Sequence, residues 1–196
     1  MSTPELIIIG ASAGGLAAIS VILRALPADF ATPLVVVQHR SRDSDALCEV
    51  MQRTTRLRVM EATDKAPTEP GCVYVAPPDY HLFVEEDYLA LSLDAPELFS
   101  RPSIDVAFES AAETRGARVV GVVLTGANHD GSRGLRRIAD RGGRAIVQDP
   151  ATAEVAVMPA AALQAVPEAT VAPLDDMARV LAEAAAGVLP SRRRRA

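Results

Sequence analysis

The stretch Leu6-Ile7-Ile8-Ile9-Gly10-Ala11-Ser12-Ala13-Gly14-Gly15-Leu16 decides the fold of this chain. Its four consecutive apolar residues predict a strand buried on both faces, and the small residues after them predict a tight turn into a helix. Such a turn either cradles a phosphate at the helix N-terminus or presents Ser12 as a nucleophile. The spacing G-x-S-x-G-G lacks the second glycine of the dinucleotide fingerprint G-x-G-x-x-G, which favours the nucleophile.

The same order of strand, turn and helix recurs along the chain. Apolar residues at helical spacing predict a helix from about Gly14 to about Leu26, because a proline follows. A second buried strand, residues 33–38, ends directly on His39. The pattern predicts further helices at residues 44–55, 104–115, 135–141, 158–166 and 174–186, and further strands at residues 73–76, 118–124, 145–148 and 170–172.

One pair of predicted strands is antiparallel. Residues 81–84 and 88–93 flank an acidic turn and predict a hairpin. We therefore expect an α/β fold of three layers (α/β/α), in which helices cover both faces of a doubly wound, mainly parallel sheet with one antiparallel hairpin. Because no linker interrupts the pattern, residues 1–187 are predicted to form a single domain and residues 188–196 a disordered, arginine-rich tail.

The composition narrows the class of function. A net charge of -5 disfavours nucleic-acid binding, and an aromatic content of 4% without tryptophan argues against a base-stacking surface. Cys48 and Cys72 have no metal-ligand spacing, and no two histidines have it, so no metal is expected. The absence of a signal peptide and of an apolar run of roughly 20 residues predicts a cytoplasmic protein without membrane insertion.

Three reactive side chains stand at or just beyond the ends of predicted strands. They are Ser12, His39 and Asp130, and reactive groups gather outside the carboxyl ends of strands in an open parallel sheet. A serine hydroxyl becomes nucleophilic when a neutral imidazole takes its proton, and a carboxylate orients that imidazole. The three residues therefore predict a catalytic triad, since triads are recognised by geometry and not by chain order.

Each of these residues also has a structural interpretation. Ser12 fits a turn or a helix cap, His39 fits a buried structural histidine, and Asp130 fits the N-cap of the helix that follows it. His129, which stands beside Asp130, is an alternative base, and Asp105, near a predicted helix start, is an alternative acid.

Seven blocks of the sequence, running in order from about residue 5 to about residue 186, match the motifs of one family. They are GASAGG at 10–15, VVVQH at 35–39, VYVAPPDYHLFV at 73–84, RPSIDVAFESAA at 101–112, GVVLTGANHDG at 121–131, GGRAIVQDP at 142–150 and MPAAAL at 158–163. On these blocks the sequence resembles the catalytic domain of CheB, the chemotaxis protein-glutamate methylesterase family.

The resemblance implies an activity and a site. The family's nucleophile, base and acid fall on Ser12, His39 and Asp130, and its oxyanion would be held by backbone N–H groups near Ala13 and Ala127. It implies a cytoplasmic serine hydrolase that removes methyl groups from glutamate 5-O-methyl esters on the cytoplasmic helices of chemoreceptors and releases methanol. Deamidation of receptor glutamines is implied as well, and no metal or cofactor is needed.

The sequence departs from the family pattern at several positions. Ala13 replaces a threonine, and Ala127-Asn128 replaces a Met-Gly pair. Arg40 stands where many members have a small apolar residue, and it is our candidate for contacting the substrate. Further candidates for such contact are Arg42, Arg53 and Arg56. The family's usual N-terminal receiver domain is absent from the sequence, so we expect a site that is constitutively open.

Two other functions stay open at this point. The departures at Ala13 and Ala127-Asn128 are compatible with a catalytically idle domain kept for its interactions. A nucleotide-binding α/β module would instead use GASAGG as a phosphate cradle, with Arg40 nearby.

Overall fold

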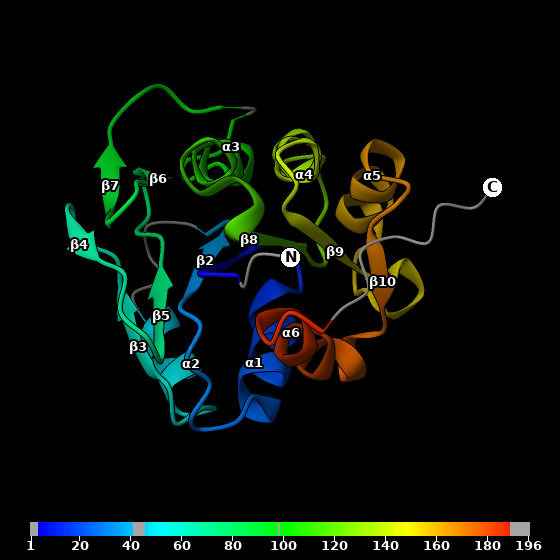
Figure 1. Cartoon of the computed structure of the whole chain (residues 1–196). Coiled ribbons are helices and arrows are strands. Elements are labelled where there is room, and N and C mark those ends of the chain that lie inside the picture. The colour runs from blue at the N-terminus through cyan, green and yellow to red at the C-terminus, as the bar shows by residue number, and fades with distance from the viewer. Residues whose placement is uncertain (1–3, 41–45, 98, 189–196) are drawn as a thin grey trace.

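A seven-stranded sheet forms the centre of the computed structural model, which describes residues 4–40, 46–97 and 99–188. The strand order is β10-β9-β8-β1-β2-β5-β3, and every neighbouring pair is parallel (Figure 1). The strands are β1 (Leu6–Ala11), β2 (Leu34–Gln38), β3 (Arg58–Glu61), β5 (Cys72–Val75), β8 (Val119–Val123), β9 (Arg144–Gln148) and β10 (Thr170–Ala172).

The order of the strands reverses at β1. The chain adds β2, β5 and β3 on one side of β1, and later adds β8, β9 and β10 on the other side. In open parallel sheets, a crevice for ligands forms at the carboxyl ends of the strands where the order reverses. The predicted nucleophile turn, which follows β1, therefore lies at this switch point.

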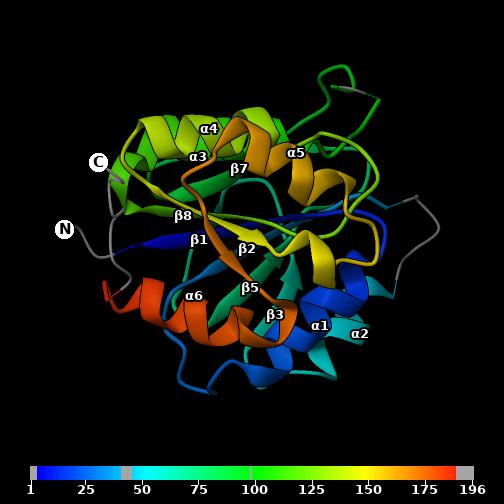
Figure 2. The ribbon, with the colours of Figure 1, turned by 90° about the vertical axis from the view of Figure 1, so that its right-hand side faces the viewer.

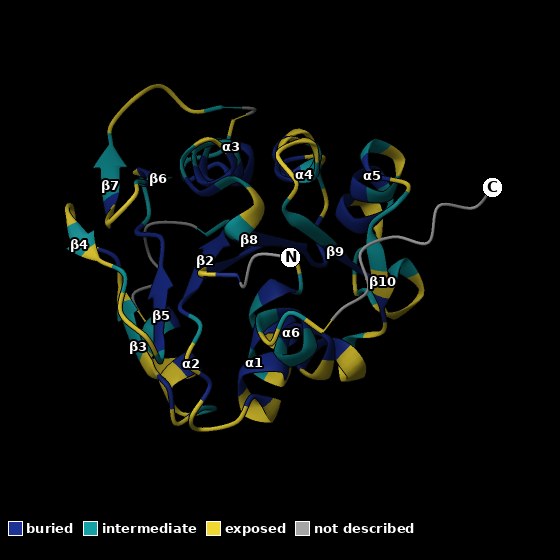
Figure 3. Ribbon diagram, in the orientation of Figure 1, coloured by how far each residue is buried: buried dark blue, intermediate teal, exposed yellow. Residues whose placement is uncertain are grey.

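Helices cover both faces of the sheet, as predicted. The helices α1 (Gly15–Ala25), α2 (Leu47–Gln52) and α6 (Met177–Ala185) lie on one face, and α3 (Ile104–Arg115), α4 (Ser132–Asp140) and α5 (Val157–Ala165) lie on the other (Figure 2). Short 3-10 helices occupy Gly116–Arg118, Pro150–Thr152 and Leu174–Asp176. Buried residues concentrate in the central strands and on the inward sides of the helices, so one core lies on each face of the sheet (Figure 3).

A second, antiparallel sheet packs beside α3. It contains the predicted hairpin, β6 (His81–Val84) with β7 (Tyr88–Ser92), and a two-residue strand β4 (Ala66–Pro67) that the sequence did not predict. Strand β3 was not predicted either, because Arg58 and Glu61 at its ends are exposed and it has no apolar run.

The segment predicted as a helix over residues 44–55 is shorter in the structure. Helix α2 spans only Leu47–Gln52, and residues 44 and 45 lie outside the described residues. Leu47 and Met51 are buried, whereas Val50 is 36% exposed. Most of the predicted tail, residues 189–196, also lies outside the described residues. No helix in the described part of the chain is long and apolar enough to cross a membrane.

Candidate active site

Two of the predicted catalytic residues directly follow neighbouring strands. Ala11, the last residue of β1, pairs in register with Gln38, the last residue of β2, so Ser12 and His39 leave the sheet side by side. The backbone N–H of His39 donates to the carbonyl of Ala11 at 3.0 Å. The register of two parallel strands therefore brings this serine and this histidine to the same edge.

The backbone around Ser12 is fixed on both sides. Its N–H donates to the carbonyl of Thr125 at 3.0 Å, and its carbonyl accepts from Gln38 Nε2 at 2.8 Å. Helix α1 has its N-cap at Gly14, whose φ of 75° suits glycine, and no side chain caps it. The side chain of Ser12 therefore does not serve as a helix cap, and its half-buried hydroxyl makes no hydrogen bond within the described residues.

Asp130 is fully buried and accepts hydrogen bonds from four donors. His39 Nε2 lies 2.8 Å from Oδ2, which also accepts from the N–H of Ile104 at 2.8 Å. Oδ1 accepts from Ser103 Oγ at 3.0 Å and from the N–H of Asp105 at 2.8 Å. The carboxylate thus meets the N-terminus of α3, where Ser103 is the N-cap. The alternative that Asp130 caps the following helix α4 is wrong, because Gly131 holds that position without a side-chain bond.

These contacts control the charge of the acid. Burial alone would raise the pKa of Asp130, but the hydrogen bonds from His39 and from the N–H groups of Asp105 and Ile104 outweigh it and lower the pKa. The positive end of the α3 dipole acts in the same direction. Asp130 is therefore ionised at neutral pH and can orient an imidazole.

The contacts of His39 define which ring nitrogen is available. An ionised carboxylate only accepts hydrogen bonds, so Nε2 of His39 carries the proton that it donates to Asp130. In the neutral ring, Nδ1 is then the acceptor. Asn128 Nδ2 lies 3.4 Å from this Nδ1, and Asn128 Oδ1 accepts from the N–H of Asp130 at 3.1 Å. The sequence marked Asn128 only as a departure from the family and did not predict this contact with the base.

The alternative base and acid face elsewhere. His129 is exposed, and within the described residues its side chain makes no hydrogen bond to Asp130. The carboxylate of Asp105 accepts from the N–H of Gly134 at 2.8 Å, so it is directed towards α4. Desolvation by burial, partly offset by that hydrogen bond, raises the pKa of Asp105 to about 6. Asp105 contributes its backbone N–H to Asp130, and its carboxylate does not serve His39.

The N–H groups proposed for the oxyanion belong to exposed turn residues. Within the described residues, the backbone N–H groups of Ala13 and Ala127 donate no hydrogen bond. The carbonyl of Ala13 accepts from Thr125 Oγ1 at 2.8 Å, which ties this turn to the turn after β8. Both N–H groups are therefore available to a substrate oxygen.

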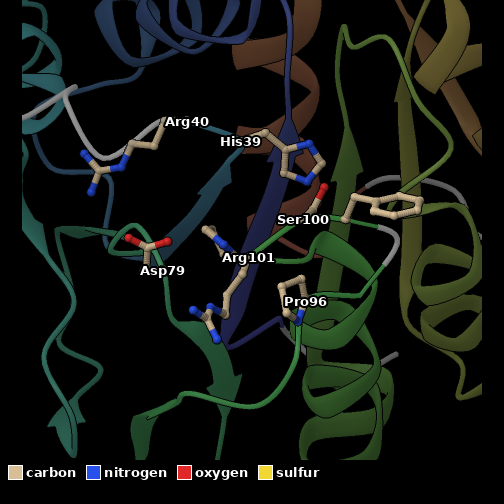
Figure 4. A pocket seen from close by; sticks show the side chains of 8 residues that line it. His39, Arg40, Asp79, Pro96, Ser100 and Arg101 are labelled. Carbon is tan, nitrogen blue, oxygen red and sulfur yellow. The ribbon is translucent and has the colours of Figure 1, made fainter.

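A cleft of about 490 Å³ opens beside His39 (Figure 4). Arg40 lines it, but its buried guanidinium pairs with Glu61 and donates to the carbonyl of Ala76 at 3.4 Å. Figure 4 shows Arg40 and Asp79 on one side of the cleft, with Pro96 and Ser100 on another. The lining residues are His39, Arg40, Asp79, Pro96, Phe99, Ser100, Arg101 and Pro102.

Two of the arginines predicted to contact substrate lie elsewhere. Arg53 and Arg56 line a different hollow together with Arg24, where α1 and α2 end. Since these helices run back from the carboxyl edge of the sheet, their ends lie at the opposite edge, away from Ser12 and His39. That prediction is wrong for Arg53 and Arg56, and Arg42 lies outside the described residues. No group of three or more His, Cys, Asp or Glu side chains that could hold a metal occurs among the residues that the structure describes.

The chain is similar to proteins of one family. It matches the family described as CheB methylesterase over residues 7–181. A protein of Leptospira interrogans, provisionally named protein-glutamate methylesterase/protein-glutamine glutaminase, is 47% identical over 163 residues, which are 82% of this chain and 84% of that protein.

In longer relatives, the region similar to this chain is only part of the protein. A protein-glutamate methylesterase/protein-glutamine glutaminase of Maricaulis maris is 41% identical over 168 residues, 83% of this chain and 42% of that protein. The crystal structure of the Thermotoga maritima CheB methylesterase catalytic domain superposes with a TM-score of 0.88 at 30% identity, covering 93% of this chain and 99% of that one.

Proposed function

The chain belongs to the CheB methylesterase family, and on that premise we propose that it is a serine hydrolase that cleaves glutamate 5-O-methyl esters on chemoreceptors. Glutamate is left on the receptor and methanol is released. Deamidation of receptor glutamines belongs to the same proposal, because the relatives' names include a glutaminase and an amide carbonyl is attacked in the same way. The observation that carries the proposal is the hydrogen bond of 2.8 Å between His39 Nε2 and the carboxylate of Asp130, which accepts hydrogen bonds from four donors.

In the acylation step, Ser12 Oγ attacks the ester carbonyl. His39 accepts the hydroxyl proton on Nδ1, since Nε2 already carries the proton shared with Asp130. Asp130 stabilises the imidazolium that forms and stays ionised. The N–H groups of Ala13 and Ala127 hold the negative charge on the carbonyl oxygen.

Collapse of the tetrahedral intermediate breaks the bond to the methoxy group. His39 donates its new proton to that oxygen, so that methanol leaves and the glutamyl group stays esterified to Ser12. A water molecule then attacks this acyl-enzyme, again with His39 as the base, and releases the glutamate side chain and the free serine. The reaction needs no oxidant or reductant, because every step is an acyl or proton transfer.

The proposal also covers the partner and the setting of the reaction. The partner is the methylated cytoplasmic helical region of a chemoreceptor, so the proposed location of the chain is the cytoplasm. Residues 1–187 are proposed to act as a single catalytic domain. Arg40 borders the cleft, and its ion pair with Glu61 leaves it the role of shaping the wall beside the base.

One experiment separates this proposal from an idle interaction domain. The purified chain is incubated with a fluorophosphonate probe, and its intact mass and labelled peptide are measured. An active hydrolase gains a single adduct on Ser12, and the Ser12→Ala variant gains none. An unlabelled wild-type protein would reject the enzyme. Thermal protection by a nucleotide, without labelling, would favour the nucleotide-binding alternative.

A further inference from the structure

The loop between β7 and α3 carries an aromatic ring in an unusual position. Phe99 is fully exposed, with a relative exposure of 103%. Glu97 and Ser100 exchange two backbone hydrogen bonds, at 2.8 Å and 3.1 Å, which close a tight turn around it. The φ angle of Phe99 is 64°, in the left-handed region.

The positive φ of Phe99 destabilises the folded state. A bulky residue with positive φ is strained, and turns of this kind normally use glycine, asparagine or aspartate. Among the described residues, three besides glycine have positive φ, and Phe99 is the only apolar one, since the others are Lys65 and Asp79. Its ring is fully exposed, so the folded chain gains no hydrophobic burial in return.

Two arginine side chains hold the loop in place. Arg133 Nη1 on α4 lies 3.2 Å from Glu97 Oε1, within an ion pair. Arg101 Nη1 donates to the carbonyls of Leu93 and Asp94, each at 3.0 Å. The ring is therefore presented by a braced turn, and such rigidity lowers the entropic cost of binding.

Phe99 also belongs to the cleft beside His39. It lines that cleft together with the exposed Pro96, which lies on another side of the cleft from Arg40 and Asp79 (Figure 4). A small ester held between Ser12 and His39 would leave a fully exposed ring uncovered. A polypeptide that carries the ester can cover it.

We propose that Phe99, together with the exposed Pro96, forms a docking surface for the protein substrate, on which an apolar side chain beside the esterified glutamate packs. The inference rests on the proposed function and names the feature that selects a protein over a small ester. Exposed aromatic side chains that become desolvated on binding dominate many interfaces. Contact with Phe99 sets the position of the substrate segment, and the neutral methyl ester then reaches Ser12.

The test compares two substrates in a variant that removes the ring without straining the turn. Phe99→Gly suits the positive φ, so the fold is retained and its thermal midpoint is equal to or above that of the wild type. Methanol release from a methylated chemoreceptor cytoplasmic fragment is measured beside hydrolysis of p-nitrophenyl acetate. We expect the ratio of the two kcat/KM values to fall about tenfold in Phe99→Gly, through KM for the receptor fragment.

Tyr88→Ala is the matched control. Tyr88 is an exposed aromatic on β7 that does not line the cleft, and its removal should leave the ratio within about twofold of the wild-type value. An unchanged ratio in Phe99→Gly, or an equal fall in Tyr88→Ala, would overturn the docking surface.

Failure of the proposed function gives a different result. Wild-type protein would then release no methanol from the receptor fragment at all. Binding of the methylated fragment to Ser12→Ala and to Ser12→Ala with Phe99→Gly still tests the surface in that case. Weaker binding in the double variant supports it, and equal binding rejects it.

Discussion

The turn after β1 and the turn after β8 share one architecture but treat their reactive residues in opposite ways. Each connects a buried parallel strand to a helix, and each N-cap is a glycine with positive φ, Gly14 in one and Gly131 in the other. Ser12 is half-buried, and its hydroxyl makes no hydrogen bond within the described residues. Asp130 is fully buried, and four donors saturate its carboxylate.

The difference follows from what each group must do. A nucleophile must move towards a carbonyl carbon, so bonds to its oxygen would have to break first. An orienting acid must keep its charge and position, so bonds to its oxygens hold it ionised against desolvation. We therefore expect removal of the serine to affect activity alone, and removal of the aspartate to affect activity and stability together.

Ser12→Ala should have the largest effect on activity and almost none on folding. Turnover of a methyl ester is expected to fall by about 10⁴-fold or more, because the nucleophile is absent. The free energy of unfolding should change by less than about 0.5 kcal/mol, since no hydrogen bond is lost. Ester kinetics and urea unfolding of the same preparation measure both. A retained rate above one per cent would remove Ser12 from the mechanism.

Asp130→Ala should lower both activity and stability. The N–H groups of Ile104 and Asp105 and the hydroxyl of Ser103 lose a buried acceptor, which should cost about 2 to 4 kcal/mol of unfolding free energy. Turnover should fall by about 10³-fold to 10⁴-fold, because His39 loses its orienting group. Asp130→Asn keeps one acceptor oxygen and should lose less stability for a similar loss of rate. Equal stability of Asp130→Ala and Ser12→Ala would contradict the contrast between the two turns.

Asp105→Asn should show that the pH dependence of stability comes from the ionisation of Asp105. Folding raises the pKa of Asp105 from 3.8 to about 6, so between these values the unfolded chain ionises first and wild-type stability falls as pH rises. The asparagine still accepts from Gly134 and carries no charge. Its unfolding free energy relative to wild type should therefore rise by the order of 2 kcal/mol between pH 4 and pH 7. A difference that stays constant with pH, measured by urea unfolding at several pH values, would contradict this assignment.

Asn128→Gly should have the smallest effect. The change removes the amide 3.4 Å from His39 Nδ1 and the acceptor for the N–H of Asp130. The family that the sequence resembles has glycine here, so turnover should fall by no more than about fivefold, with a stability loss of about 1 kcal/mol. Steady-state kinetics check the rate. A loss of a hundredfold would instead place Asn128 in the catalytic machinery.

The sequence could predict the features that depend on local pattern. The apolar runs of β1, β2 and β8 predicted a parallel sheet, and parallel strands bring their carboxyl ends to one edge whatever the details of packing. Ser12 and His39 follow two such strands directly, so their meeting at that edge could be foreseen. The N-cap at Ser103 was equally local, because a serine before an apolar helical stripe is a short-range signal.

The features that escaped prediction depend on distant segments. The N–H groups that hold Asp130 belong to residues 25 and 26 positions earlier in the chain, and no periodicity records that contact. The ion pair of Arg40 with Glu61 joins the end of β2 to the end of β3, a strand without an apolar run. Arg53 and Arg56 lie at the opposite edge because α2 runs back along the sheet, and no local sequence pattern specifies that direction.

The attachment of Asp130 to the first turn of α3 has a consequence for slow dynamics. First-turn amides of a helix have no partner within the helix and usually exchange their protons with water quickly. The amides of Ile104 and Asp105 donate to a fully buried carboxylate, so they should exchange only when α3 separates from the turn after β8. The same separation removes the orienting acid from His39. Deuterium uptake at these two amides would therefore report the fraction of molecules whose triad is disassembled, without any substrate present.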